Sequence, residues 1–186
     1  YENEMADMIK TGLNYKGPAF IRYPRGEGPG KPLKETPQAL ELGISERAKK
    51  GIEIDIWALG AMFDLGEKLA LRLSEHNITA GLINPRFIKP IDENLIISSA
   101  NKSKLIVTLE DSVIKGGFGS AVLEVINDNK INCPVERIGW PDKFIDHGTS
   151  VQQLRDSVNL DLESILEKVI LRFQDIKGKD AKVELN

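Results

Sequence analysis

The chain has 186 residues, 41% of them hydrophobic, and a formal net charge of -3 at pH 7. This length and composition can furnish a core, so we expect a globular protein. The charge excludes the strongly basic surface of nucleic-acid and anionic-membrane binders, and no apolar run reaches membrane-spanning length. The single cysteine, Cys133, excludes an internal disulfide and a multi-cysteine zinc site, and it is typical of a reducing compartment.

The amino-terminal part predicts a short helix, one strand and a linker. Apolar residues of the stretch 1–12 fall on one side of a helix that Gly12 can terminate. The segment 17–24, GPAFIRYP, indicates a buried strand. Because one helix and one strand cannot bury a core, we expect residues 1–26 to be the end of an upstream domain. Proline and glycine in residues 27–39 then indicate a linker.

From residue 40 onward, strands and helices alternate. Residues 40–56 predict a hairpin with a Lys-Lys-Gly turn. The elements expected after it are a helix at 62–73, a strand at 78–84, a helix at 92–101, a strand at 104–110, a helix at 119–128, a strand at 133–139, a helix at 151–158 and a helix from 162. Asp92 and Asp161 are expected to cap two of these helices.

This alternation predicts an α/β fold with a mostly parallel open sheet and helices on both faces. The hairpin would add an antiparallel strand at one edge. We expect the domain to span residues 40–174, and the charged residues 175–186 to form a flexible tail.

Arg22 and Arg25 stand where the first strand is expected to end, in the frame Arg-Tyr-Pro-Arg-Gly. Side chains at the carboxyl end of a strand in an open α/β sheet point into the crevice where ligands bind. A guanidinium presents a planar fork of donors that suits a phosphate or a carboxylate. The commoner alternative is that both arginines pair with acidic residues across a domain boundary, and spacing alone leaves both possibilities open.

A glycine-rich loop with Gly116, Gly117 and Gly119 follows one predicted strand and precedes a helix. Its backbone N–H groups could approach an anion. The loop lacks the spacing of a dinucleotide-binding or Walker loop, so a tight turn with close helix packing is the commoner role. Glu110 and Asp111 precede it, and because adjacent strand residues face opposite ways we do not expect them to work together as acid and base.

The loop of residues 139–150 carries Asp142, Asp146 and His147. A histidine beside an acid could shuttle protons, or it could cap the helix that follows. Without a serine or cysteine nucleophile in a recognisable elbow, the structural role is favoured. His76 is expected at a helix end, where it would interact favourably with the helix dipole. No cluster with metal-ligand spacing occurs in the sequence.

Four motifs follow one another along the chain: GPAFIRYPRG, INPRFIKPID, VTLEDSVIKGGFGSAV and IGWPDKFIDHGT. Together they resemble, over residues 1 to about 172, the carboxyl-terminal portion of the 1-deoxy-D-xylulose-5-phosphate synthase family, thiamine-diphosphate enzymes of the transketolase group. Members join pyruvate to D-glyceraldehyde 3-phosphate with loss of carbon dioxide, and so supply precursors of isoprenoids, thiamine and pyridoxal. The resemblance implies that residues 1–26 end the pyrimidine-binding domain and that residues 40–174 form a transketolase-like carboxyl-terminal domain.

The resemblance also implies a site. In related enzymes an arginine at the end of this strand reaches the phosphate of the acceptor sugar, and Arg25 aligns with it. Arg22 is the second candidate and would otherwise hold the strand end. The Gly-Asp-Gly and asparagine motif that holds Mg²⁺ and the cofactor diphosphate does not occur here, nor does a match to the region of the activating glutamate. We therefore expect thiamine diphosphate and Mg²⁺ in the full-length enzyme, and neither a bound cofactor nor turnover for this polypeptide alone.

No catalytic residue can be assigned to the carboxyl-terminal domain, which we expect to support the active site and to contact the second subunit of a homodimer. A transketolase or the beta subunit of a 2-oxo acid dehydrogenase is an alternative, although these should lack RYPRG together with GGFGS. A non-catalytic α/β module that works through subunit contacts is another. A chain that begins with Tyr1 hints at a piece of a longer polypeptide. The resemblance implies a bacterial cytoplasm, or a plastid in a plant or alga.

Overall fold

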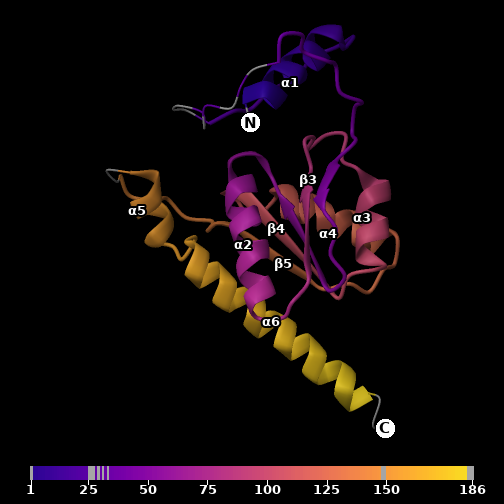
Figure 1. Ribbon diagram of the computed structural model, residues 1–186, viewed down its shortest axis with the longest axis vertical. Coiled ribbons are helices and arrows are strands. Elements are labelled where there is room, and N and C mark those ends of the chain that lie inside the picture. The colour runs from indigo at the N-terminus through magenta and orange to yellow at the C-terminus, as the bar shows by residue number, and fades with distance from the viewer. Residues whose placement is uncertain are drawn as a thin grey trace.

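The computed structural model describes residues 2–24, 28, 30, 32, 34–147 and 150–183. At its centre lies a five-stranded sheet with the strand order β1-β3-β2-β4-β5 (Figure 1). The strands are β1 (Glu46–Lys49), β2 (Ile54–Ala58), β3 (Ala80–Asn84), β4 (Leu105–Val113) and β5 (Val135–Trp140). Strand β1 pairs antiparallel with β3, and the other neighbours pair in parallel. The predicted α/β fold, with a mostly parallel sheet and one antiparallel edge strand, is confirmed.

Helices cover both faces of this sheet: α2 (Phe63–Glu75) and α6 (Leu162–Val183) pack on one face, and α3 (Glu93–Ala100) and α4 (Phe118–Asp128) on the other. The remaining helices are α1 (Glu2–Asn14), the 3-10 helix η1 (Gly60–Met62) and α5 (Val151–Asp156), and α1 lies apart from the sheet (Figure 1). Both predicted caps are present: Asp92 accepts a hydrogen bond from the Leu95 N–H at 3.0 Å, and Asp161 accepts one from the Ser164 N–H at 2.9 Å. The side-chain and backbone hydrogen bonds from Ser164 lower the pKa of Asp161.

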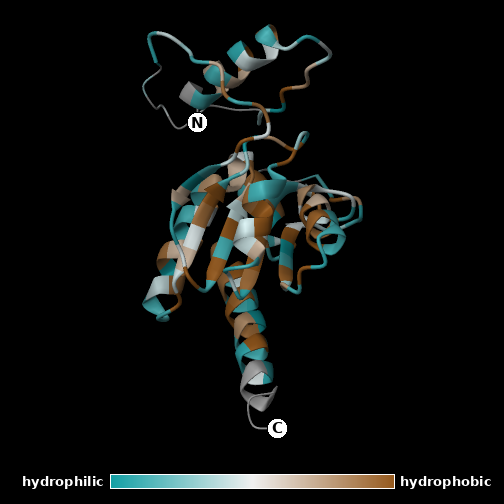
Figure 2. Cartoon of the chain, turned by 90° about the vertical axis from the view of Figure 1, so that its right-hand side faces the viewer, coloured by the Kyte–Doolittle hydropathy of each residue, from teal (hydrophilic) through white to brown (hydrophobic). Residues whose placement is uncertain are grey.

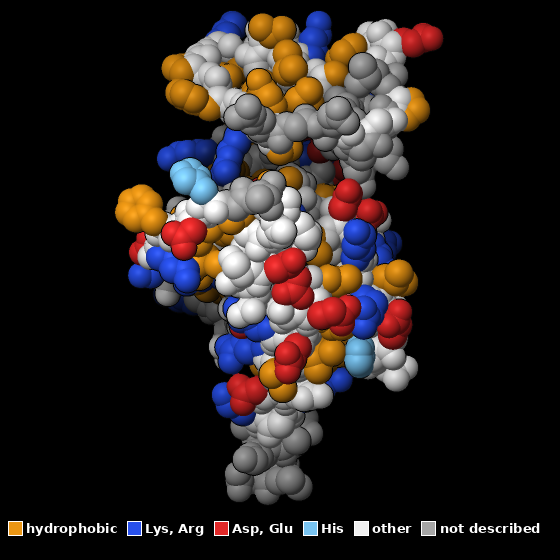
Figure 3. Space-filling model, turned by 90° about the vertical axis from the view of Figure 1, so that its left-hand side faces the viewer, with side chains coloured by type: hydrophobic (Ala, Val, Ile, Leu, Met, Phe, Trp, Pro, Cys, Tyr) orange, Lys and Arg blue, Asp and Glu red, His pale blue; other side chains and the backbone are white. Residues whose placement is uncertain are grey.

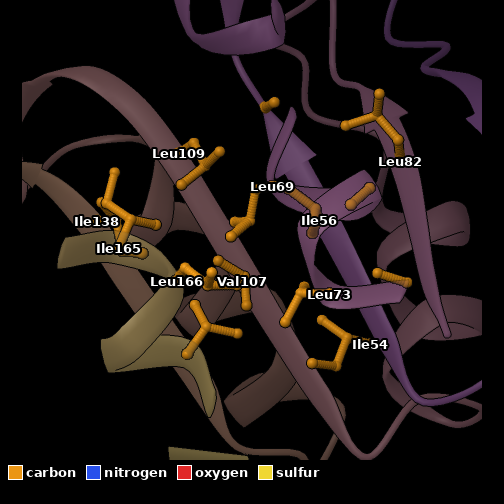
Figure 4. Packing of buried hydrophobic residues seen from close by; sticks show 14 of the residues in the cluster. Ile54, Ile56, Leu69, Leu73, Leu82, Val107, Leu109, Ile138, Ile165 and Leu166 are labelled. Carbon is orange, nitrogen blue, oxygen red and sulfur yellow. The ribbon is translucent and has the colours of Figure 1, made fainter. Parts of the chain in front are cut away.

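Two apolar clusters hold the layers together, one on each face of the sheet. The larger cluster joins the sheet to α2 and α6, and Figure 4 shows Leu69 and Leu73 of α2 and Leu166 of α6 against the strands. The other cluster joins the sheet to α3 and α4 and contains Trp57 and Phe118, whose ring centroids are 6.4 Å apart. Figure 2 shows hydrophobic residues concentrated in the sheet and alternating with hydrophilic ones along α6. Close packing on both faces therefore holds the strands, and the residues at their ends, in fixed positions.

The predicted hairpin between the first two strands of the domain is wrong, because β3 lies between β1 and β2. Strand β2 is buried along its whole length, including Asp55. Arg47 of β1 reaches Asp55 with two hydrogen bonds, of 2.8 and 3.1 Å. This reach passes β3 at Gly81, where a Cβ atom would lie 2.3 Å from Asp55 Oδ1. The missing side chain thus lets the edge strand form a charge pair with a central strand two positions away.

The predicted buried strand at residues 17–24 is also wrong. Residues 18–24 form neither helix nor strand and are exposed, with Phe20 96% and Tyr23 67% accessible. A strand needs a neighbouring backbone to take up its N–H and C=O groups. Within the part of the chain that the structure describes, no strand pairs with this segment. Helix α1 also continues past Gly12 to Asn14.

Helix α6 continues as far as Val183, through much of the stretch 175–186 that is expected to form a tail. Glu136 of β5 attaches the helix to the sheet through Lys168, whose Nζ lies 2.7 Å from Glu136 Oε1. The boundaries proposed for the upstream segment, the linker, the domain and the tail stay predictions.

Candidate functional site

The carboxyl ends of β3, β4 and β5 lie along one edge of the sheet, and the amino-terminal segment contacts this edge. Glu4 of α1 accepts hydrogen bonds from Asn84 Nδ2 at 2.9 Å and from Arg86 Nε at 2.7 Å. Further along, Arg22 Nη2 donates to the carbonyl oxygen of Asp111 at 2.8 Å. Ligands of open α/β sheets bind outside the carboxyl ends of the strands. The candidate site is therefore this edge together with the segment that lies on it.

Asp111 is a meeting point of several elements at this edge. Its Oδ1 accepts a hydrogen bond from Trp140 Nε1 at 2.7 Å, and its Oδ2 lies 3.3 Å from Arg155 Nη2. The pairing of β4 with β5 is irregular between Leu109 and Val113, and such a bulge re-aims the side chains it contains. The carboxylate of Asp111 is thus held from two sides while its carbonyl faces the amino-terminal segment.

Of the two arginines in the Arg-Tyr-Pro-Arg-Gly frame, only Arg22 lies within the described residues. Arg22 binds the backbone carbonyl of Asp111, and the strand end that it would otherwise hold is not formed. Arg25, which the resemblance aligns with the phosphate contact, lies outside the described residues. The phosphate-binding roles of Arg25 and Arg22 stay predictions.

Arg86 makes the second contact between the amino-terminal segment and the sheet edge. Its φ of +60° is a left-handed conformation that residues with a side chain adopt at a cost in free energy. In this conformation its guanidinium joins Glu4 to Glu46 of β1, with Nη2 2.7 Å from Glu46 Oε2. No pattern in the sequence indicated this bridge, since its three members lie far apart in the chain.

Asp7 fastens residues of the predicted linker to α1. Its buried carboxylate accepts a hydrogen bond from the Gln38 N–H at 2.7 Å and another from the ammonium group of Lys34. Thr11 Oγ1 accepts from the Leu40 N–H at 2.7 Å one turn further along the helix. The hydrogen bond from Lys34 lowers the pKa of Asp7 against the opposing effect of burial. The carboxylate is therefore charged, and paired, at neutral pH.

The glycine-rich loop before α4 is occupied by a side chain of the protein itself. Glu110 is fully buried and accepts hydrogen bonds from the Phe118 N–H at 2.7 Å, the Gly119 N–H at 2.9 Å and the Ser112 hydroxyl at 2.5 Å. These are the N–H groups that an external anion would need. A Cβ atom on Gly117 would lie 2.1 Å from Glu110 Oε2. The loop is a tight turn with close packing, the commoner of the two roles considered for it.

Glu110 and Asp111 face opposite ways, as expected of neighbours in a strand. The Glu110 carboxylate turns toward the loop before α4, whereas that of Asp111 turns toward Trp140 and Arg155. The sequence analysis did not place Glu110 at the amino end of the helix; the signal that could have suggested it is an acid directly before a glycine-rich loop.

The loop after β5 does not assemble a proton shuttle. Asp142 pairs with Lys115 at 3.2 Å on the surface, while Asp146 and His147 are exposed. Helix α5 is capped by Ser150, whose hydroxyl accepts from the Gln153 N–H at 3.2 Å, so His147 does not have the capping role. His76 stands at the carboxyl-terminal cap of α2, the helix end expected for it.

Three further properties of the described residues concern metal binding, the cysteine thiol and membrane insertion. Within residues 2–24 and 34–147 and the other described positions, no group of three or more histidine, cysteine or carboxylate side chains could hold a metal ion. Burial raises the pKa of the Cys133 thiol to about 11. None of the described helices is long and apolar enough to cross a membrane. The carboxylates of the described residues therefore form no group that fits Mg²⁺.

Comparison with known proteins shows a family match and close relatives. Residues 43–165 match the model of the transketolase C-terminal domain. The chain is 44% identical to the 1-deoxy-D-xylulose-5-phosphate synthase of Acidobacterium capsulatum, over 90% of this chain and 27% of that protein. It is also 44% identical to the synthase of Methylacidiphilum infernorum, over 99% of this chain and 29% of that protein. The chain therefore spans little more than a quarter of the length of these relatives.

Solved structures share the fold. A structure titled "Split gene transketolase, inactive beta4 tetramer" matches with a TM-score of 0.66 and 31% identity, over 73% of this chain and 44% of that one. A Pichia stipitis transketolase matches with a TM-score of 0.51 and 16% identity, over 70% of this chain and 18% of that one. The second likeness concerns the fold alone. Both support the transketolase-like architecture that the sequence motifs implied.

Proposed function

Because the chain belongs to the transketolase C-terminal domain family, we propose that it forms the carboxyl-terminal part of a 1-deoxy-D-xylulose-5-phosphate synthase. The observation that carries this proposal is the 44% identity to synthases over 90–99% of the chain. The similarity therefore extends beyond the family match at residues 43–165 into the amino-terminal segment with the Arg-Tyr-Pro-Arg-Gly frame. In this proposal the longer protein condenses pyruvate with D-glyceraldehyde 3-phosphate and releases carbon dioxide.

The alternatives receive less support. The transketolase structures are 31% and 16% identical to the chain and match 73% and 70% of it, which is less than the synthases on both counts. In the proposal, residues 1–26 end an upstream domain. A free-standing interaction module would not have such a segment. The contacts of Glu4 and Arg22 with the sheet edge are of the kind that join successive parts of one larger protein.

In the proposed enzyme, the role of this chain is to position the acceptor substrate. Thiamine diphosphate, held with Mg²⁺ by residues of the longer protein, would supply the carbon–carbon bond chemistry. The Arg25 guanidinium would bind the acceptor phosphate through its fork of donors and so hold the aldehyde in place. The domain of residues 40–174 would support this site and contact the second subunit of a homodimer. We propose the cytoplasm of a bacterium, or a plastid, as the location.

Carbon dioxide release from pyruvate tests this function in the full-length protein. Release should require D-glyceraldehyde 3-phosphate, thiamine diphosphate and Mg²⁺. Arg25→Ala should raise the KM for the phosphorylated acceptor by about tenfold or more, because a charged hydrogen-bond donor is lost. An unchanged KM would move the phosphate contact elsewhere, and no acceptor-dependent release would refute the synthase.

The same assay tests the polypeptide of 186 residues by itself. We expect no turnover from it, since the motif that holds Mg²⁺ and the cofactor diphosphate in this family does not occur in its sequence. Measurable turnover by the purified polypeptide would contradict this expectation.

A further inference from the structure

The segment of residues 18–24 lies on the sheet edge without any strand pairing. In a strand, backbone hydrogen bonds on both sides would fix the position of each residue. Among the described residues, a hydrogen bond from Arg22 Nη2 to the Asp111 carbonyl, 2.8 Å long, ties the segment to the domain. Its position therefore depends on how firmly the end of β4 is held.

Three elements converge to hold that end. Trp140 closes β5, Arg155 lies in α5, and both bind the carboxylate of Asp111 in β4. The Arg155 side chain is 16% exposed and that of Asp111 33%, so solvent screens this pair only in part. A carboxylate fixed by two donors restrains the backbone of its own residue. The carbonyl that receives Arg22 is thus presented in one orientation.

The charge of this group also suits an anionic ligand. The guanidinium group of Arg155 pairs with the Asp111 carboxylate, while that of Arg22 binds the backbone carbonyl of the same residue, so two cations stand beside one anion. The group as a whole is positive, and a positive group at the carboxyl edge of a parallel sheet favours a negatively charged substrate. Arg22 also stands three residues before Arg25 in the sequence, a distance that the chain can span with about 10–11 Å at most.

We infer that Arg22, Asp111, Trp140 and Arg155 form a positioning cluster that sets the affinity of the enzyme for the phosphate of its acceptor. The inference rests on the proposed function. These four residues act through the segment that follows Arg22 and are not catalytic. The cluster makes the carboxyl-terminal domain a determinant of acceptor binding, in addition to being a support.

The test uses the full-length enzyme and separates the two substrates. Pyruvate carries no phosphate, so a positioning defect should appear in one KM only. Arg22→Gln should raise the KM for D-glyceraldehyde 3-phosphate by about tenfold and leave the KM for pyruvate and kcat unchanged. Arg22→Lys should restore part of the loss, because an ammonium group can donate to the same carbonyl. Trp140→Phe should act in the same direction with a smaller change, since Arg155 still holds Asp111.

Two controls make the outcome decisive. Arg72→Gln, at a partly exposed arginine of α2 that pairs with Glu75 and Glu163, should change neither KM. In the double variant with Arg22→Gln and Trp140→Phe, the effect should be no larger than that of Arg22→Gln alone, because both changes act through one contact.

Each other outcome overturns a different statement. An active enzyme in which Arg22→Gln leaves the acceptor KM unchanged would overturn the positioning cluster and leave the synthase standing. A rise in both KM values, with a lower melting temperature, would assign these residues a general structural role and also overturn the inference. No acceptor-dependent release by the unaltered enzyme would remove the proposed function itself.

Discussion

The amino-terminal segment and the α/β domain are stabilised in different ways. The domain buries its apolar side chains between the sheet and the helices, and Leu69 and Leu73 are fully inaccessible. The segment exposes its own: Leu13 is 79% accessible and Phe20 96%. Figure 3 shows apolar side chains gathered on this segment, above the domain. Helix α1 is attached instead by polar contacts through Glu4 and Asp7. A buried core can sustain a fold by itself, whereas a segment with exposed apolar groups and a few polar contacts depends on what surrounds it.

The largest expected difference between the two regions is in the response to truncated apolar side chains. Leu69→Ala should lower the free energy of unfolding by about 2–5 kcal/mol, because it removes buried surface and leaves a cavity. Phe20→Ala, at a larger but exposed side chain, should change it by less than about 0.5 kcal/mol. Chemical denaturation followed by tryptophan fluorescence would measure both. A large effect of Phe20→Ala would show that the segment has a core of its own.

Glu110 offers the next largest effect, inside the domain. Glu110→Ala should destabilise the protein by about 2–3 kcal/mol, because the N–H groups of Phe118 and Gly119 would lose their buried acceptor. Glu124→Ala, at an exposed glutamate of α4, is the matched control and should be nearly neutral. Equal stability of the two variants would mean that the carboxylate does not hold the loop.

A smaller and more local effect is expected at Asp7. The pKa of this group is lowered in the folded protein, mainly by the hydrogen bond from Lys34. Its stabilising effect is therefore fully present above the ordinary carboxyl pKa, about 3.9, and is lost as the pH falls through the lowered folded value. Asp7→Asn should lower the free energy of local opening of α1 by about 1 kcal/mol at pH 7. Hydrogen exchange of the α1 amides should become faster in the variant, while that of β2 and β4 should stay unchanged.

The smallest effect is expected at the surface pair of Lys115 with Asp142, whose side chains are 72% and 57% exposed. Lys115→Ala should change the free energy of unfolding by less than about 0.5 kcal/mol, because solvent and salt screen such pairs. Thermal unfolding at low and high salt would measure it. A larger, salt-dependent loss would show that the loop after β5 contributes to the stability of the domain.

The elements that the sequence predicted well are those with a strong internal pattern. The helices of residues 62–73 and 119–128 carry apolar residues at helical spacing, and the strand at 104–110 is continuously apolar, so each is defined without knowledge of its partners. Such patterns within one segment do not show which strands pair with one another in the sheet. The stretch 40–56 alternates like a hairpin, yet its two strands are separated by β3. The stretch 17–24 is apolar like a strand, but no described strand lies beside it.

The sequence identified some residues of the candidate site but not the contacts that these residues make. The resemblance suggested that Arg22 holds a strand end, whereas in the structure residues 18–24 form no strand and Arg22 binds the Asp111 carbonyl. The sequence could not indicate Trp140 and Arg155, because their common partner depends on a bulge in β4 and on the placing of α5. Glu110 was identified as an acid at a strand end, whereas its position under the glycine-rich loop follows from the packing of α4.

The contact of Arg47 with Asp55 past Gly81 also protects the sheet against aggregation. Strand β3, with the sequence AGLIN, is apolar and uncharged, and its outer edge would be open to another chain if β1 were absent. Strand β1, with the sequence ERAK, is largely exposed and has no apolar face to fix its register. The bidentate pair fixes it instead, since a slip by one residue would move Arg47 to the other face of the sheet. A short charged strand thereby covers an apolar strand edge that could otherwise pair with a neighbouring molecule.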